Sequence, residues 1–217
     1  MIEISSTDAE NIIGLKHKYQ FTGDKTAPLA VLIHGRAGNY DVMWTFKRCI
    51  PESYNIISFQ APEHDPIGGY SWWQVAGGEK ILDSLPAADK LIASIHSAIK
   101  HYKLSPKFLI ALGFSQGAVI LSVILQKSPE IFSSVGLLAG LVVEIEENSV
   151  RNSKSLPQIF FAHGINDEVI PVAKAKKGQS YLKKLGFNTT LVEDSVGHKV
   201  GTEGMRELKE FLINSTC

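Results

Sequence analysis

Short apolar segments alternate with longer amphipathic segments along this chain. Several of the short segments are apolar at successive positions, which indicates burial on both faces of a sheet and favours parallel pairing. The alternation predicts an α/β fold, in which helices cover both faces of a mostly parallel central sheet. The predicted strands are Leu29 to Ile33, Asn55 to Phe59, Lys107 to Leu112, Ser134 to Leu138, Gln158 to Ala162 and Thr189 to Glu193.

Four helices are predicted between and after these strands. Apolar residues recur at spacings of three and four from Pro86 to Tyr102, which is the pattern of a helix with one apolar face. The other helices span about Ser115 to Gln126, Val172 to Leu185 and Gly201 to Ile213. Two segments that follow strands, Gln60 to Gly78 and Leu141 to Leu156, are predicted to be irregular. Loops beyond the carboxyl ends of strands form the ligand site in open α/β sheets, so we expect both segments near it.

Length and charge restrict the class of protein. At 217 residues the chain is predicted to form a single domain over residues 1–217. Its 22 Lys and Arg balance 22 Asp and Glu, so no net charge attracts nucleic acid or an anionic membrane, and a small-molecule partner is expected. The chain has no apolar run of roughly 20 residues for stable membrane insertion and no secretory signal pattern. With only Cys49 and Cys217, far apart, it is predicted to be cytoplasmic; its oligomeric state is left open.

A serine stands between two glycines in the stretch Gly113-Phe114-Ser115-Gln116-Gly117, where a predicted strand passes into a predicted helix. This is the setting in which G-x-S-x-G presents a nucleophilic serine. Side chains at positions 113 and 117 would collide with the neighbouring strand and helix in so sharp a turn. Taken alone, the motif also fits a glycine-flanked turn whose serine caps the helix.

A serine hydroxyl needs a base that takes its proton and an acid that orients the base. In the chain order Ser, acid, His, only two histidines follow Ser115. His198, in a loop between the last strand and the last helix, is the expected base, and His163 at a strand end is interpreted as structural. Asp167, in a short loop after a buried strand, is the preferred acid. The other candidates for the acid are Glu168, Glu193 and Asp194, the last as an indirect partner of the base.

Acyl transfer also requires donors for the oxyanion that develops on the substrate. One is expected to be the main-chain N–H of Gln116, whose role is assigned to its backbone rather than its side chain. The second is expected from the loop at residues 34–39, HGRAGN, in which glycines let the backbone turn its N–H groups toward the site. This loop lacks the glycine pattern of phosphate-binding loops. The histidines and cysteines are dispersed, so no metal and no cofactor are expected.

Four segments in this order, LIHGRAGN, GFSQGAV, HGINDEVIPV and VGHKV, resemble the small serine esterases of the α/β-hydrolase superfamily. The resemblance is to the phospholipase/carboxylesterase group, which includes acyl-protein thioesterases, and it runs from about Leu29 to the C-terminus. It implies an α/β-hydrolase fold with a minimal cap. It also implies a serine carboxylesterase that cleaves esters of small or medium acyl groups without a metal or cofactor.

Position by position, the resemblance makes Ser115 the nucleophile, His198 the general base and then acid, and Asp167 the orienting acid. It assigns the oxyanion donors to the main chain of Arg36 and Gln116.

Trp72 and Trp73 match an aromatic pair of the family, and they either line the acyl pocket or anchor the loop.

Two features depart from the family pattern. Arg36 stands where members often have an apolar residue, which leads to the hypothesis of a substrate with an acidic group. The segment Leu141 to Glu147 differs from the acyl-protein thioesterases. The sequence leaves open a thioesterase, a lysophospholipase, a lyase or acyltransferase on this fold, and a hydrolase-fold binding protein with little turnover.

Overall fold

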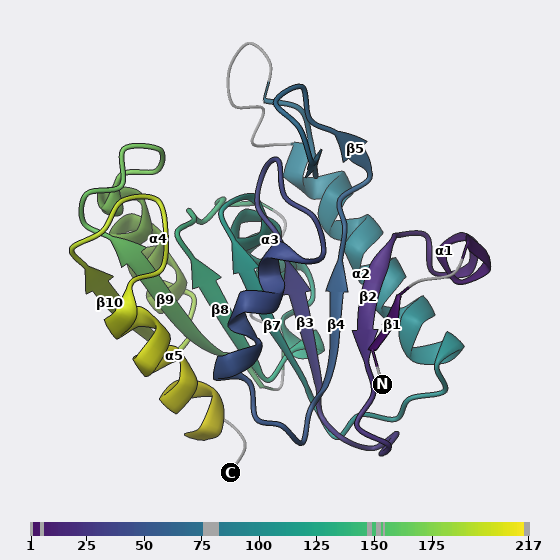
Figure 1. Ribbon diagram of the computed structural model, residues 1–217. Helices are drawn as coiled ribbons and strands as arrows, with labels where there is room; N and C mark the ends of the chain where they lie inside the picture. Colours follow the sequence, from purple (N-terminus) through teal and green to yellow (C-terminus); the bar gives the residue numbers. More distant parts are fainter. Residues whose placement is uncertain are drawn as a thin grey trace.

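The centre of the structure is an eight-stranded sheet with the strand order β1-β2-β4-β3-β7-β8-β9-β10 (Figure 1). The computed structural model describes residues 2–4, 7–75, 83–146, 149–150, 153 and 155–214. The six strands from β4 to β10 in this order pair in parallel, and β1 and β2 add an antiparallel edge. The strands are β1 (Ile2–Ile4), β2 (His17–Gln20), β3 (Leu29–Ile33), β4 (Asn55–Phe59), β7 (Leu109–Phe114), β8 (Ser134–Leu138), β9 (Gln158–Gly164) and β10 (Thr189–Asp194).

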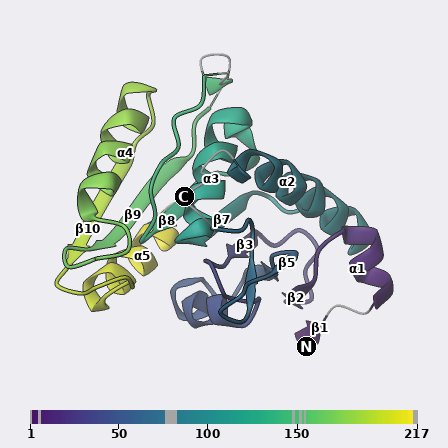
Figure 2. The same cartoon turned by 90° about the horizontal axis from the view of Figure 1, so that it is seen from above.

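Helices cover both faces of the sheet (Figure 2). One face carries α1 (Thr7–Ile13), α2 (Ser84–His101), α3 (Gln116–Lys127) and α4 (Val172–Lys184), and the other carries α5 (Thr202–Asn214) and the 3-10 helix η1 (Val42–Cys49). Each face has its own hydrophobic cluster. In β3, Leu29, Val31 and Ile33 belong to one cluster and Ala30 and Leu32 to the other, which explains the unbroken apolar run. The predicted mostly parallel sheet with helices on both faces is therefore confirmed.

All six predicted strands and all four predicted helices are present, with ends that differ by at most two residues. The pattern missed β2, the strand between β1 and β4, in which His17 and Tyr19 are buried and Lys18 and Gln20 are half-buried. It also missed β1, α1 and η1. These elements are short or carry polar residues at alternate positions, so no apolar run marks them.

The two segments predicted to be irregular are described in part. Residues 60–75 contain only the short strands β5 (Glu63–His64) and β6 (Tyr70–Ser71), which pair as a hairpin beyond the carboxyl end of β4 (Figure 1). Residues 76–78, parts of 141–156, and Cys217 lie outside the described residues. In the described part of the chain, no helix is long and apolar enough to cross a membrane.

Candidate active site

Ser115 lies in a sharp turn between β7 and α3. Its backbone has φ 51° and ψ −114°, a conformation that L-residues rarely adopt and that costs about 1–3 kcal/mol. A Cβ at Gly113 would collide with the carbonyl group of Gly117 at the start of the helix, and a Cβ at Gly117 would collide with the carbonyl oxygen of Ile33 in β3. The predicted reason for both glycines is therefore confirmed. The serine side chain makes no capping hydrogen bond to the helix, so the alternative of a capping serine is wrong.

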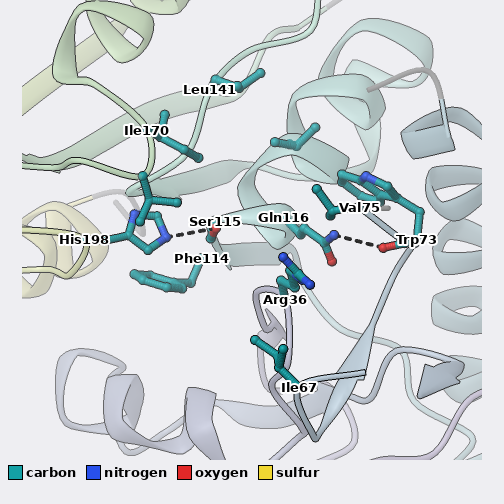
Figure 3. Close-up of a pocket in the computed structure, with 12 residues that line it drawn as sticks. Arg36, Ile67, Trp73, Val75, Phe114, Ser115, Gln116, Leu141, Ile170 and His198 are labelled. Carbon is teal, nitrogen blue, oxygen red and sulfur yellow. Dashed lines mark hydrogen bonds between the residues drawn. The ribbon is translucent and has the colours of Figure 1, made fainter. Parts of the chain in front are cut away.

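Ser115, His198 and Asp167 form a chain of hydrogen bonds. His198 Nε2 lies 3.0 Å from Ser115 Oγ (Figure 3), and His198 Nδ1 lies 2.8 Å from Asp167 Oδ2. When Nδ1 carries the imidazole proton, its N–H donates a hydrogen bond to the carboxylate. Nε2 is then unprotonated and can accept a hydrogen bond from the serine hydroxyl. This arrangement can remove the hydroxyl proton as the oxygen attacks a carbonyl.

The carboxylate of Asp167 is buried and held on both oxygens. Oδ1 accepts the main-chain N–H groups of Val169 at 2.9 Å and Ile170 at 2.8 Å. Burial raises the pKa of Asp167, but the hydrogen bonds from the Ile170 main chain and from His198 together outweigh it and lower this pKa. Asp167 is therefore ionised at neutral pH and can stabilise a positive charge on His198.

A second histidine faces the same carboxylate. His163 is buried, and its Nε2 donates to the carbonyl oxygen of Ile170 at 2.7 Å and lies 3.2 Å from Asp167 Oδ2. This contact with the main chain agrees with the interpretation of His163 as structural, whereas its contact with Asp167 was not predicted. The other candidate acids lie elsewhere: Asp194 accepts the N–H of Gly204 in α5, Glu193 pairs with Lys176, and Glu168 is exposed.

The loop after β3 passes directly beside the serine. A Cβ at Gly35 would lie 3.0 Å from the Cβ of Ser115, a tight contact that glycine avoids. His34 is fully buried and fixes this loop, because its Nδ1 donates to the carbonyl oxygen of Gly35 at 2.6 Å and its Nε2 accepts the N–H of Ala61 at 2.9 Å. Burial lowers the pKa of His34 to about 4, so the imidazole is neutral and keeps this pattern at neutral pH.

The predicted oxyanion donors are the main-chain N–H groups of Arg36 and Gln116. They belong to the residues that directly follow Gly35 and Ser115, the two residues in the tight contact. Gln116 follows the serine as the first residue of α3, and Arg36 follows Gly35. N–H groups in the first turn of a helix have no partner within the helix. Among the hydrogen bonds between described residues, neither of these two N–H groups has an acceptor. Both are available to a ligand.

The side chain of Gln116 has a role that its assignment to the backbone alone did not include. Its Oε1 accepts the N–H of Trp72 at 3.1 Å. Its Nε2 donates to the carbonyl oxygen of Trp73, also at 3.1 Å (Figure 3). The two predicted roles, lining the pocket and anchoring the loop, belong to different tryptophans. Trp73 lines the cleft over the serine, whereas Trp72 is buried and donates from Nε1 to the carbonyl oxygen of His34 at 2.8 Å. Trp72 does not line this cleft, and its contacts are those of the loop anchor that was the other interpretation.

A cleft of about 250 Å³ opens over Ser115. In Figure 3, Leu141 and Ile170 lie on one side of the serine. Arg36 and Ile67 lie on the other side. The cleft lining includes no carboxylate among residues 2–4, 7–75, 83–146, 149–150, 153 and 155–214. The apolar lining residues are Ile67, Trp73, Val75, Phe114, Val119, Leu141, Val169 and Ile170. Within the described residues, no three His, Cys, Asp or Glu side chains are grouped to hold a metal ion.

The side chain of Arg36 is held by a buried carboxylate behind it. Its Nε donates to Asp65 Oδ2 at 2.8 Å, and the Arg36 side chain is 39% exposed whereas that of Asp65 has no exposed surface. Hydrogen bonds from Arg36, from the Ser71 hydroxyl and from the Ile67 main chain lower the pKa of Asp65 to about 2. Sequence reasoning singled out Arg36 but missed Asp65, because an aspartate in a segment rich in Pro and Gly is typical of a turn.

We expect Asp65→Asn to lower Tm at neutral pH and to have less effect in acid. The folded-state pKa of Asp65 lies below the unfolded value of about 3.9, so the ionised carboxylate stabilises the fold above about pH 4. This contribution disappears as the pH falls toward about 2. Calorimetry from about pH 3 to pH 7 should show a difference in Tm that is constant above about pH 5 and shrinks below about pH 4. The control is Asp89→Asn, which removes an exposed partner of Lys127. A difference in Tm that does not change with pH would contradict this account.

Comparisons with known proteins agree with the fold. The sequence model of the phospholipase/carboxylesterase family matches residues 20–216. The Bacillus cereus carboxylesterase structure has 20% identity and a TM-score of 0.82 over 95% of this chain and 97% of its own. The Mesorhizobium loti carboxylesterase has 16% identity and a TM-score of 0.81 over 98% of each chain. Esterase PE8 has 22% identity and a TM-score of 0.77 over 92% of this chain and 97% of its own. Among curated proteins, none matches the sequence.

Proposed function

Because this chain belongs to the phospholipase/carboxylesterase family of α/β-hydrolases, whose members are esterase-type hydrolases, we propose that it cleaves carboxylic esters with Ser115 as the nucleophile. The observation that carries this proposal is the hydrogen-bonded chain from Ser115 through His198 to Asp167 at an apolar cleft. The cleft volume of about 250 Å³ lies just below the range of about 300–1,000 Å³ that is usual for ligand pockets, which favours small or medium acyl groups.

In the first half of the proposed reaction, Ser115 Oγ attacks the ester carbonyl while His198 Nε2 takes the hydroxyl proton. Asp167 stabilises the imidazolium that forms. The main-chain N–H groups of Arg36 and Gln116 donate to the oxyanion, and a donor of this kind contributes about 10²- to 10³-fold to kcat. The imidazolium then gives its proton to the leaving alkoxide, and an acyl ester on Ser115 remains.

In the second half, water enters in place of the alcohol. His198 Nε2 takes a proton from this water as the oxygen attacks the acyl ester, and the same N–H groups bind the second oxyanion. The proton returns to Ser115 Oγ as the carboxylic acid leaves. The side chains of the triad and the main-chain donors carry every proton and charge, so the proposed reaction needs no metal and no cofactor.

A fluorophosphonate probe tests this proposal, because it reacts with an activated serine and not with an ordinary one. We expect rapid labelling of the wild type and of a Ser105→Ala control, in which an exposed serine is removed, and no labelling of Ser115→Ala. A panel of aryl esters, acyl thioesters and lysophospholipids of graded chain length gives the substrate preference. We expect the highest kcat/KM for esters of short to medium length.

Other outcomes of these experiments distinguish the rival functions. The absence of labelling under native conditions, together with tight binding of esters, would indicate a hydrolase-fold binding protein. Labelling combined with a strong preference for long thioesters would indicate a thioesterase, and preference for long acyl chains on a phosphorylated alcohol would indicate a lysophospholipase.

A further inference from the structure

We propose that the substrates of this site are anionic esters, with a carboxylate on one arm that binds the guanidinium of Arg36 and an apolar group on the other arm. This substrate class rests on the proposed function, because it concerns the same cleft.

The guanidinium of Arg36 has donors left for a ligand. Of its five N–H groups, those on Nε and Nη2 that face Asp65 are used, with distances of 2.8 Å to Oδ2 and 3.4 Å to Oδ1. The two N–H groups of Nη1 and the second one of Nη2 have no acceptor among the described residues. These groups form the other edge of the planar fork, which matches the two oxygens of a carboxylate.

Asp65 holds this fork in place before a ligand arrives. Its carboxylate also accepts the Ser71 hydroxyl at 2.6 Å and the Ile67 N–H at 3.1 Å, so its position is fixed from several sides. A fixed arginine loses less side-chain entropy on binding than a free one. Because Asp65 has no exposed surface, a ligand in the cleft contacts the guanidinium and not its counterion. A bound carboxylate is therefore closer to the positive charge than to the negative one.

The rest of the cleft supports one anionic arm and one apolar arm. Among the described residues that line the cleft, Arg36 is the only one with a permanent charge, and none is a carboxylate that would repel an anion. Figure 3 shows Arg36 on one side of Ser115, and Leu141 and Ile170 on the other. A substrate whose carbonyl group lies at Ser115 thus extends one arm toward the guanidinium and the other toward apolar side chains.

Matched ester pairs test this inference. The first pair is the para-nitrophenyl monoester of glutaric acid and para-nitrophenyl pentanoate, in which a carboxylate replaces a methyl group on the acyl arm. The second is the butyrate ester of para-hydroxybenzoate and that of para-hydroxyacetophenone, in which the carboxylate is on the alcohol arm. We expect the wild type to favour the anionic ester in one of the pairs. The ratio of kcat/KM for the anionic ester to that for the neutral one should fall about 10- to 100-fold in the Arg36→Gln, Asp65→Asn double variant.

The double variant avoids leaving the buried Asp65 carboxylate without its cation, and circular dichroism verifies that it folds. Arg36→Lys keeps the charge but not the fork, so its ratio should lie between those of the wild type and the double variant. Glutarate binding to Ser115→Ala protein, measured by calorimetry, is a readout that needs no turnover, and adding the double substitution should weaken it about 10- to 100-fold.

Equal ratios in the wild type and the double variant for both pairs, with equal glutarate binding, would overturn the inference. Hydrolysis of the neutral esters that depends on Ser115 would leave the proposed function intact in that case. Glutarate binding that depends on Arg36, without hydrolysis of any ester by the wild type, would support the anion site and contradict the proposed function.

Discussion

Ser115→Ala is expected to lower kcat for ester hydrolysis by about 10⁵-fold or more, because it removes the attacking oxygen. The Cβ of alanine occupies the same place as that of serine, so the backbone at φ 51° is no more strained than before and Tm should change little. Steady-state kinetics with a para-nitrophenyl ester and a thermal melt measure the two effects. Ser105→Ala, at an exposed serine, is the control and should match the wild type. Hydrolysis within tenfold of the wild-type rate would contradict the assignment of the nucleophile.

Asp167→Asn is expected to lower kcat by about 10⁴-fold. The asparagine oxygen can still accept the N–H groups of Val169 and Ile170, so its NH₂ group is turned toward His198 Nδ1. Two donors cannot face each other, and the imidazole proton moves to Nε2. In that tautomer His198 has no lone pair for the hydroxyl proton of Ser115.

Pre-steady-state and steady-state kinetics of Asp167→Asn measure this loss. The control is Glu168→Gln, an exposed carboxylate that is the next residue along the chain, and its kcat should equal that of the wild type. A loss of tenfold or less in folded Asp167→Asn protein would mean that His198 does not depend on this carboxylate.

The sequence predicted β3, whose side chains are buried on both faces of the sheet, and missed β2, in which only alternate residues are buried. β3 has five successive buried residues, and the apolar run marks its ends in the sequence. β2 lies between β1 and β4 near the edge of the sheet, and only its alternate residues are buried. One of these is His17, whose Nε2 lies 2.7 Å from the hydroxyl of Tyr102. A polar residue buried by a partner 85 positions away leaves no local pattern.

The chain order of the motifs predicted that Ser115, Asp167 and His198 meet, and hydrogen bonds join them across 83 and 31 positions. Strand ends and the glycine-flanked turn specify where each loop emerges, and parallel strands bring these loops to one edge of the sheet. For this reason the sequence alone was enough to predict which three side chains meet at the site.

The contacts that support the catalytic residues could not be predicted from the sequence in the same way. Asp65 behind Arg36, the Gln116 side chain between the two tryptophans, and His163 beside Asp167 each depend on how loops fold against one another. The motifs specify where Gln116 and His163 stand in the sequence but not what their side chains contact, and Asp65 lies in none of the motifs. For Asp65 the only signal was an acidic residue in the same irregular segment as the predicted aromatic pair.

The most direct test of the central claim is the mass of the protein during turnover. Rapid acid quenching of the wild type with a para-nitrophenyl ester, followed by peptide mass spectrometry, should find the acyl group on the peptide that contains Ser115. His198→Ala should show no such adduct on the same timescale. Full turnover with no adduct on Ser115, or with the acyl group on another residue, would contradict the proposed mechanism.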